Sequence, residues 1–289
     1  MRSSPALTGD ERPEAPSSPA GRRVHLLNAV SASVLAIFIV GILALVVADV
    51  WYVSRAGLTP GDAWKILTAP DVLRSVRMSL VTSLATLLLV LLVSVPAGYA
   101  LSRLRFPGHA LANALVDAPI VLPPVVVGVS LLAFFGTPVG EWIKAGLRSA
   151  EWSLASGIGI VICQFLMAVS YSIRANKAGF DSVDRRLEEV ALSLGCSPLQ
   201  AFFRVTLPLA RASVLAGSVM AWARAIGVFG PLMVFVGTGP RVAVMPTQIW
   251  LELSVGNIEV ALAVAMVMLG MAGAALALVH LLSPGRSWT

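Results

Sequence analysis

Long apolar runs alternate with short polar segments along this chain of 289 residues. Six of the runs are long enough to cross about 30 Å of hydrocarbon, which takes about 20 residues of helix. A helix satisfies its own backbone hydrogen bonds where no water is present, so each run predicts a membrane-spanning helix. The predicted spans are Ala29–Trp51, Met78–Leu101, Leu111–Phe135, Leu154–Ile173, Ala212–Val236 and Ile258–Leu282. The expected fold class is all-α, a polytopic membrane protein with six transmembrane helices.

Composition supports this fold class and also predicts an N-terminal tail. The chain is 57% hydrophobic and 12% charged, with a mean hydropathy of +0.85, well above the balance of a soluble domain. Residues 1–24 are rich in Ser, Pro, Ala and Gly, and we expect them to form a disordered cytoplasmic tail before a single transmembrane domain over residues 25–289. Cys163 and Cys196 lack metal-ligand spacing and are expected to be reduced, with no metal bound.

The distribution of Lys and Arg predicts the orientation. With the N-terminus inside, the inner segments hold about twice as many Lys and Arg residues as the outer loops, as cytoplasmic loops do. We therefore expect both termini in the cytoplasm. The net charge of +6 is explained by topology, and nucleic-acid binding is not expected because no basic stretch is interleaved with aromatic residues.

The polar loop at about residues 175–210, between the fourth and fifth spans, has a pattern of its own. Asp181–Leu194 has helical periodicity and stops at Gly195, which can adopt the left-handed conformation that ends a helix. Ser197 and Pro198 then suit the cap and first position of a second short helix, expected to end before Pro208. This helix would carry an exposed aromatic pair, Phe202 and Phe203. The two helices predict a projecting knob.

At these positions the chain resembles the permease subunits of bacterial ABC importers. Their cytoplasmic loop reads Glu-Ala-Ala, three residues, Gly, nine residues and Ile-x-Leu-Pro, matched here by Glu189, Val190, Ala191, Gly195, Val205, Leu207 and Pro208. The resemblance implies a coupling helix, at about Cys196–Phe203, that seats in a separate ATPase subunit. The expected coupling residues are Glu188, Glu189, Ala191, Gly195, Ser197, Pro198, Phe202, Phe203, Leu207 and Pro208. The alternative is an ordinary amphipathic helix pair at the membrane interface.

The chain itself is not expected to be an enzyme or to bind a cofactor. No G-x-x-x-x-G-K-[ST] motif occurs, so this chain has no P-loop to hold ATP phosphates. ATP and Mg would be hydrolysed by the partner subunit. Within the loop, we expect Glu189 to stabilise the knob by pairing with basic residues or backbone N–H groups, and Gly195 to permit the turn.

A second resemblance, over about Val76 to Leu282, is to molybdate, tungstate and sulfate permeases. It rests on the Pro-rich segment Asp117–Gly128, on Ala223–Gly230, and on the motifs Met245–Trp250 and Gly256–Glu259. It implies import of an oxyanion. One departure is Val228, where such relatives commonly carry Glu. The alternative substrates are other small solutes.

Several residues in the spans are candidates for the translocation path. Prolines and glycines in a span free backbone groups or permit bends. The candidate hinge or close-packing positions on the path are Pro123, Pro124, Gly128, Gly227 and Gly230. The alternative is plain helix packing, because small residues pack helices in any bundle. A guanidinium in mid-span is costly and faces a cavity or a partner. Arg224 could meet a passing anion or pair with Asp117, and we favour the ion pair.

The partners implied by the resemblance are a dimer of cytoplasmic ABC ATPase subunits, an extracytoplasmic substrate-binding protein and a second, identical permease subunit, in the bacterial inner membrane. A rival function is an ion-coupled secondary transporter, which needs titratable relay groups in mid-span. His25, His109 and His280 lie at or beyond span ends, and only Asp117 is a candidate carboxylate. An intramembrane enzyme is disfavoured because no acid or His is placed to activate a nucleophile.

Overall fold

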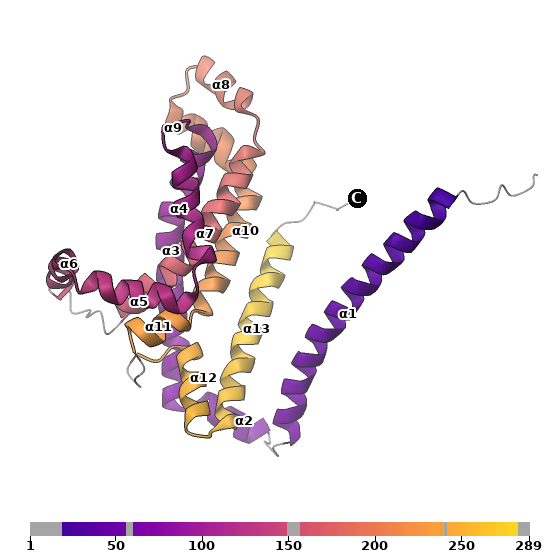
Figure 1. Ribbon diagram of the computed structural model, residues 1–289, viewed down its shortest axis with the longest axis vertical. Helices are drawn as coiled ribbons and strands as arrows, with labels where there is room; N and C mark the ends of the chain where they lie inside the picture. Colours follow the sequence, from indigo (N-terminus) through magenta and orange to yellow (C-terminus); the bar gives the residue numbers. More distant parts are fainter. Residues whose placement is uncertain (1–18, 56–59, 149–156, 238, 240–241, 283–289) are drawn as a thin grey trace, which may run out of the picture. The chain divides into compact units, whose positions relative to one another are not determined.

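The computed structural model describes residues 19–55, 60–148, 157–237, 239 and 242–282, and within these ranges all regular structure is helical (Figure 1). The helices are α1 (Pro19–Arg55), α2 (Pro60–Leu67), α3 (Pro70–Arg103), α4 (His109–Val121), α5 (Pro124–Phe135), α6 (Pro138–Arg148), α7 (Gly157–Asp181), α8 (Arg185–Ser193), α9 (Pro198–Ala201), the π-helical turn η1 (Phe202–Thr206), α10 (Leu207–Ile226), α11 (Gly230–Phe235), α12 (Met245–Ser254) and α13 (Ile258–Leu282). The all-α prediction is confirmed.

Five helices in the described chain are long and apolar enough to cross a membrane, or six if one bent pair counts as a span. They contain Val30–Trp51 of α1, α3, α7, Pro198–Ile226 and Ile258–Ala275 of α13. Each corresponds to a predicted span. The start of the fourth predicted span, residues 154–156, lies outside the described residues.

The N-terminal helix α1 (Pro19–Arg55) belongs to a different unit from the other helices. The helix begins at Pro19, so the end of the predicted tail, residues 19–24, is helical. Residues 1–18 of that tail lie outside the described residues.

The third predicted span is bent, not continuous. α4 and α5 meet at 111° across Leu122 and Pro123, and α5 runs across the direction of α4 in Figure 1. Leu122 is extended, with ψ 136°, as a residue before proline prefers. Pro123 is also extended, with ψ 133°, and precedes Pro124, which opens α5. Two successive prolines therefore break the helix that hydropathy alone joins.

The fifth predicted span also differs from its prediction. α10 begins at Leu207 and ends at Ile226, and α11 is a separate short helix, so Ala212–Val236 is not one helix. The helix expected to end before Pro208 instead continues through η1, where the Leu207 N–H bonds to the Phe202 carbonyl five residues back. Pro208 has no N–H to donate inside this continuous helix, and the π-helical turn lies directly before it.

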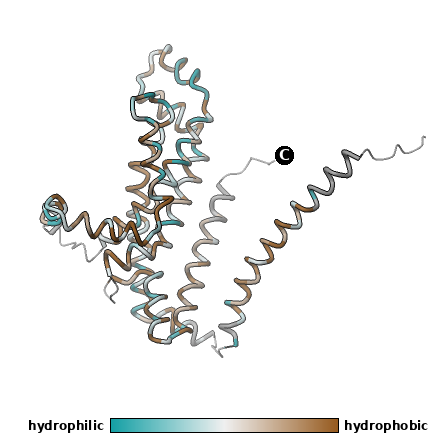
Figure 2. Tube along the Cα trace, viewed as in Figure 1, coloured by the Kyte–Doolittle hydropathy of each residue, from teal (hydrophilic) through white to brown (hydrophobic). Residues whose placement is uncertain are grey.

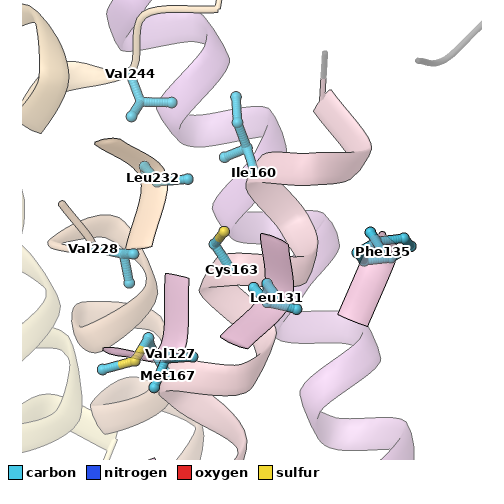
Figure 3. Close-up of a cluster of buried hydrophobic side chains, with 9 residues drawn as sticks. All are labelled: Val127, Leu131, Phe135, Ile160, Cys163, Met167, Val228, Leu232 and Val244. Atoms are coloured by element: carbon cyan, nitrogen blue, oxygen red, sulfur yellow. The ribbon is translucent and has the colours of Figure 1, made fainter. Parts of the chain in front are cut away.

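The core of the second unit is built from α3, α7 and α10. An apolar cluster lies beside it, where α5 and α11 approach α7 (Figure 3); its members are Val127, Leu131, Phe135, Ile160, Cys163, Met167, Val228, Leu232 and Val244. The polar end of the unit is at α8 and α9, beyond the ends of α3, α7 and α10, whereas α5 is mostly apolar (Figure 2). This arrangement separates a polar loop from the apolar bundle.

Candidate functional site

The loop between α7 and α10 is held by a complete set of helix caps. The Asp184 carboxylate accepts a hydrogen bond from the Arg186 N–H at 3.0 Å and caps the start of α8. At the other end, the Cys196 N–H bonds to the Ala191 carbonyl at 3.1 Å and the Gly195 N–H to the Leu192 carbonyl at 3.0 Å. These two bonds form a Schellman motif. Gly195 has φ +88°, so the predicted glycine turn is confirmed.

The second short helix starts with a capping box. Ser197 accepts a hydrogen bond from the Gln200 N–H, and the Gln200 side chain accepts one from the Ser197 N–H at 2.9 Å. Pro198 occupies the first turn, where its missing N–H is harmless. The predicted cap and first position are therefore as expected, and Ala191 and Ala201 are buried beneath the turn.

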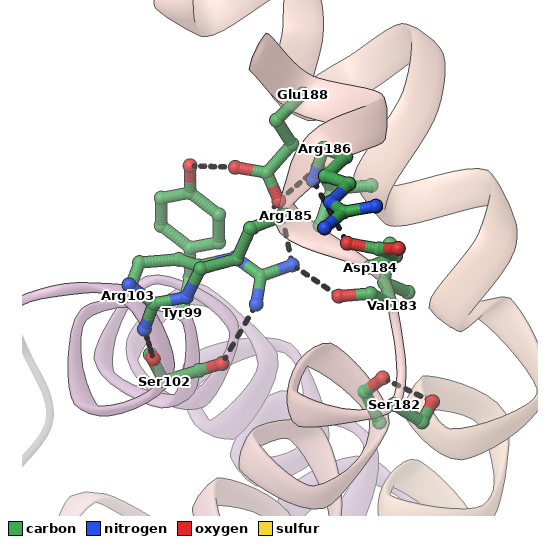
Figure 4. A network of polar contacts seen from close by, with 11 residues as sticks. Tyr99, Ser102, Arg103, Ser182, Val183, Asp184, Arg185, Arg186 and Glu188 are labelled. Atoms are coloured by element: carbon green, nitrogen blue, oxygen red, sulfur yellow. Dashed lines mark hydrogen bonds and ion pairs between the residues drawn. The ribbon is translucent and has the colours of Figure 1, made fainter.

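Glu188 fixes this loop to the end of α3 (Figure 4). Its carboxylate accepts hydrogen bonds from Arg103 Nε at 2.8 Å, Thr206 at 2.8 Å and the Tyr99 hydroxyl at 3.1 Å. The Arg103 guanidinium also donates to the Val183 carbonyl. The two charged side chains are only 8% and 13% exposed, so this is a nearly buried ion pair with its hydrogen-bonding capacity used.

The electrostatics of Glu188 follow from these partners. Burial alone would raise the pKa of its carboxyl. The hydrogen bonds from Arg103 and Thr206, together with the Arg103 charge, outweigh burial and hold the pKa below its usual range. Glu188 is therefore ionised at neutral pH, and α8 is held to α3 and η1 by a charge-assisted contact.

The predicted role of Glu189 is wrong. Its side chain is exposed and makes no ion pair or side-chain hydrogen bond within the described residues; the preceding residue, Glu188, makes the contacts instead. The reason is helical phase. Ala191 points into the loop's core, and Glu188, three residues earlier, shares that face, whereas Glu189 does not.

One face of the loop is apolar and uncovered by the described chain. On α8, Leu187, Val190 and Leu194 share a face at spacings of three and four, and Leu194 is 80% exposed. Beyond the turn, Leu199 and Phe203 are also exposed. The predicted exposed aromatic pair is half correct, because Phe202 packs edge-on against Tyr99 with 4.8 Å between ring centroids. Leu207 packs on the same cluster, and Pro208 is exposed.

The candidate path residues of α5 and α11 serve close packing. A Cβ atom on Gly128 would lie 2.9 Å from Pro231 Cα, and one on Gly230 would lie 3.3 Å from Pro124 Cβ. Gly227 lies in the break after α10, where a Cβ would meet only ordinary contacts. Pro123 lies at the bend between α4 and α5.

The predicted ion pair between Asp117 and Arg224 is wrong. Asp117 forms a two-bond ion pair with Arg174 of α7. Arg224 has no ion pair or hydrogen bond within the described chain: its Nε is buried and unbonded, and its guanidinium carbon lies 5.8 Å from the centroid of the Tyr171 ring. Val228, where relatives commonly carry Glu, is buried in the apolar cluster.

Sequence reasoning missed the residues that complete these contacts. Arg103 and Arg174 counted only as charges that set topology. No pattern pointed to Tyr99, Thr206 or Asn113, whose side-chain oxygen accepts a hydrogen bond from Arg174. Arg103 lies at the end of a span and contacts Glu188 across 85 residues of sequence. No spacing rule reports such a contact.

The comparisons with known proteins agree with this geometry. Residues 91–287 match the family model described as "Binding-protein-dependent transport system inner membrane component". A molybdate/tungstate transport system permease protein of Thermococcus kodakarensis is 39% identical over 59% of this chain and 63% of that protein's length. A probable molybdenum ABC transporter permease protein of Haloferax volcanii is 37% identical over 78% of this chain and 80% of that protein.

The fold has a solved counterpart. The crystal structure of a bacterial ABC transporter involved in the import of the acidic polysaccharide alginate matches with a TM-score of 0.68 at 18% identity, covering 90% of this chain and 94% of the other. The family model covers the end of α3 and the described helices from α4 to α13, and so includes the capped knob and the broken span. The chain is a multi-pass membrane protein that belongs to the family of binding-protein-dependent transport system inner membrane components.

Proposed function

We propose that this chain is the permease subunit of an ATP-driven importer of tungstate or molybdate, with sulfate as a further candidate. It forms the transmembrane path with a second, identical copy and is driven by a dimer of separate ATPase subunits. A substrate-binding protein delivers the oxyanion from outside. The alternatives are an importer of another small solute and an ion-coupled secondary transporter.

The observation that carries this proposal is the rigid knob with an uncovered apolar face. Leu187, Val190 and Leu194 would cost free energy in water, at about 25 cal/mol per Å² of exposed apolar surface, and such patches mark interaction sites. The caps and the Arg103–Glu188 pair hold the patch on a stiff support. A stiff support transmits a push from a partner to α3 and α10 without yielding.

Two further features support the oxyanion and the orientation. The relatives named for molybdate and tungstate suggest the substrate, and Arg224, in the last turn of α10, supplies a cation that pairs with no carboxylate of the described chain. The excess of Lys and Arg on the loop side favours a cytoplasmic knob and cytoplasmic termini. ATP is available on that side.

Association with the ATPase tests the coupling role. We expect Leu194→Asp to abolish copurification of the ATPase subunit with this chain from detergent extracts, because it puts a charge in the apolar contact. Ser193→Asp is the matched control, since Ser193 lies on the polar side of α8 with Glu189, and it should retain the ATPase. Retention by Leu194→Asp would overturn this docking face.

The substrate is tested separately. The purified binding protein that docks on the outer face is titrated with tungstate, molybdate, sulfate and phosphate. We expect the tightest binding for tungstate or molybdate. Binding of a sugar or peptide in place of all four anions would overturn the oxyanion assignment.

A further inference from the structure

A polar stripe crosses the surface where α4 packs on α7. On α4, His109, Asn113 and Asp117 recur every four residues and share one face. On α7, Tyr171 and Arg174 are one turn apart. The Asn113 side chain bonds to the His109 carbonyl at 2.9 Å, and Arg174 donates to Asn113 Oδ1 at 3.2 Å as well as to Asp117. These contacts are continuous from His109 to Arg174.

Arg224 of α10 extends the stripe at its other end. Its guanidinium carbon lies 5.8 Å from the Tyr171 ring centroid, within the range of a cation–π contact. Side chains lean towards the N-terminus of their helix, which is the loop end of α10, so Arg224 leans towards Tyr171 and the turn that carries Arg174. The Arg224 guanidinium therefore contacts the Tyr171 ring, and Arg174 lies one turn further along α7.

The stripe is partly exposed on helices that their length and composition assign to membrane depth. The Arg174 side chain is 34% exposed and the Asp117 side chain 41%, although α7 and the α4–α5 pair both meet the criteria for a span. α4 has no buried residue, so the described chain leaves much of its surface uncovered. Charged groups at such depth face a water-filled cavity or a partner and not lipid. We assign the stripe to the wall of a wet path.

The charges along the wall suit a passing anion. A guanidinium binds an oxyanion through paired N–H groups, and within the described residues no carboxylate competes for Arg224. The paired N–H groups of Arg174 already bind the Asp117 carboxylate. Conduction requires binding that is firm enough for entry and weak enough for exit. The Asp117 carboxylate meets this requirement because it competes with the passing anion for the Arg174 guanidinium.

We propose that Arg224 and Arg174 form an anion relay, in which a tetrahedral oxyanion passes from one guanidinium to the other and displaces Asp117 from Arg174 on the way. Tyr171 holds Arg224 in position between the two steps. The inference rests on the proposed transport of an oxyanion. It assigns Asp117 the role of the counter-ion that releases the cargo.

Binding of tungstate to the permease itself tests the relay. The complex of this chain with its ATPase subunits is placed in lipid nanodiscs without the binding protein, and bound tungstate is measured by equilibrium dialysis. We expect Asp117→Asn to tighten binding about tenfold and Arg174→Gln or Arg224→Gln to weaken it about tenfold. Arg211→Gln, a control at an exposed arginine of the same helix α10, should bind like the parent protein.

The alternative is that Asp117 and Arg174 only clamp α4 to α7. In that case Asp117→Asn weakens binding as Arg174→Gln does, or leaves it unchanged, and either result overturns the relay. The double variant Asp117→Asn with Arg174→Gln keeps a neutral hydrogen-bonding pair and so separates charge from folding. The relay predicts that it assembles normally and still binds tungstate about tenfold more weakly, and parent-like binding by this variant contradicts the relay.

Uptake separates this inference from the proposed function. Proteoliposomes that contain the complex, with ATP inside and the binding protein outside, should accumulate tungstate, and Asp117→Asn should accumulate it several-fold more slowly because release is slower. Parent protein that accumulates no oxyanion overturns the proposed substrate. Parent protein that accumulates tungstate while all three variants match it overturns the relay alone.

Discussion

Arg103 with Glu188 and Arg174 with Asp117 are ion pairs of the same chemistry in different surroundings. The first pair is 8% and 13% exposed and gains further hydrogen bonds from Tyr99 and Thr206. The second is 34% and 41% exposed. Removing one partner of a nearly buried, hydrogen-bonded ion pair strongly destabilises the folded protein. An exposed ion pair contributes little to its stability. The first is suited to holding a loop and the second to exchanging partners.

The largest effect is expected at Glu188. Glu188→Ala leaves the Arg103 guanidinium nearly buried without its counter-ion, and such losses cost about 3–5 kcal/mol. We expect a clear fall in the thermal unfolding midpoint of the detergent-solubilised protein and loss of ATP-coupled uptake. Glu189→Ala is the matched control and should change stability by less than about 0.5 kcal/mol. Equal effects of the two variants would contradict the assigned network.

Asp117→Asn tests the more exposed of the two ion pairs. Because that pair is partly exposed, its loss should cost no more than about 1 kcal/mol of stability, while the affinity for tungstate rises. The thermal midpoint of Asp117→Asn should therefore lie near that of the parent. A fall as large as that of Glu188→Ala would show that both pairs are structural.

The packing of α5 on α11 gives an intermediate effect. A Cβ on Gly128 would lie 2.9 Å from Pro231 Cα and 3.0 Å from its carbonyl oxygen, both backbone atoms. Gly128→Ala should cost about 1–3 kcal/mol through overpacking, measured as a lower midpoint of thermal unfolding. Gly227→Ala, whose Cβ meets its nearest atom at 3.5 Å, should be close to neutral.

The turn at Gly195 gives a comparable but purely backbone effect. Its φ of +88° lies in the left-handed region, and a Cβ atom added to this glycine would meet no other atom within 4 Å. Gly195→Val should therefore cost about 1–2 kcal/mol from strain alone and reduce ATP-coupled uptake. Asparagine tolerates this backbone conformation, so Gly195→Asn should retain more uptake than the valine variant. The reverse order would contradict the Schellman turn.

The smallest effect is the pH dependence of the loop. The folded-state pKa of Glu188 lies below its unfolded value, so its stabilisation is fully present above the unfolded pKa, about 4.3. It is lost as the pH falls through the folded pKa. The protection factors of α8 amides, which compare each exchange rate with the intrinsic rate at the same pH, should fall in this acid range, and Glu188→Gln should remove that part of the pH dependence. A fall in protection between pH 6 and 8 would point to another group.

Much of the fold was predictable because lipid imposes a simple pattern. The existence of five spans follows from hydropathy and length alone, although the fifth begins and ends earlier in the chain than predicted. The breaks at Pro123 and after Ile226 were not predicted as helix ends, since the residues on both sides are equally apolar and a hydropathy run cannot show a bend. Both sites carried Pro and Gly, which indicated a hinge without deciding between a kink and a full break.

The loop between α7 and α10 also has contacts that were predictable from the sequence and contacts that were not. The cap residues Ser197 and Gly195 were predictable because capping is local, within about four residues. The partner of Glu188 was not, since Arg103 approaches it only after α3, α7 and α8 have packed. Arg174 was assigned to topology for the same reason. Its contact with Asp117 depends on how α4 packs on α7, which no spacing in the sequence reports.

ATP-driven accumulation of tungstate in proteoliposomes tests the central claim most directly. We expect accumulation only when this chain, its ATPase subunits, the binding protein and ATP are all present, and hydrolysis without accumulation in any Glu188→Ala complex that still assembles. Equal accumulation without ATP, driven by an imposed proton or sodium gradient, would contradict the claim and identify a secondary transporter.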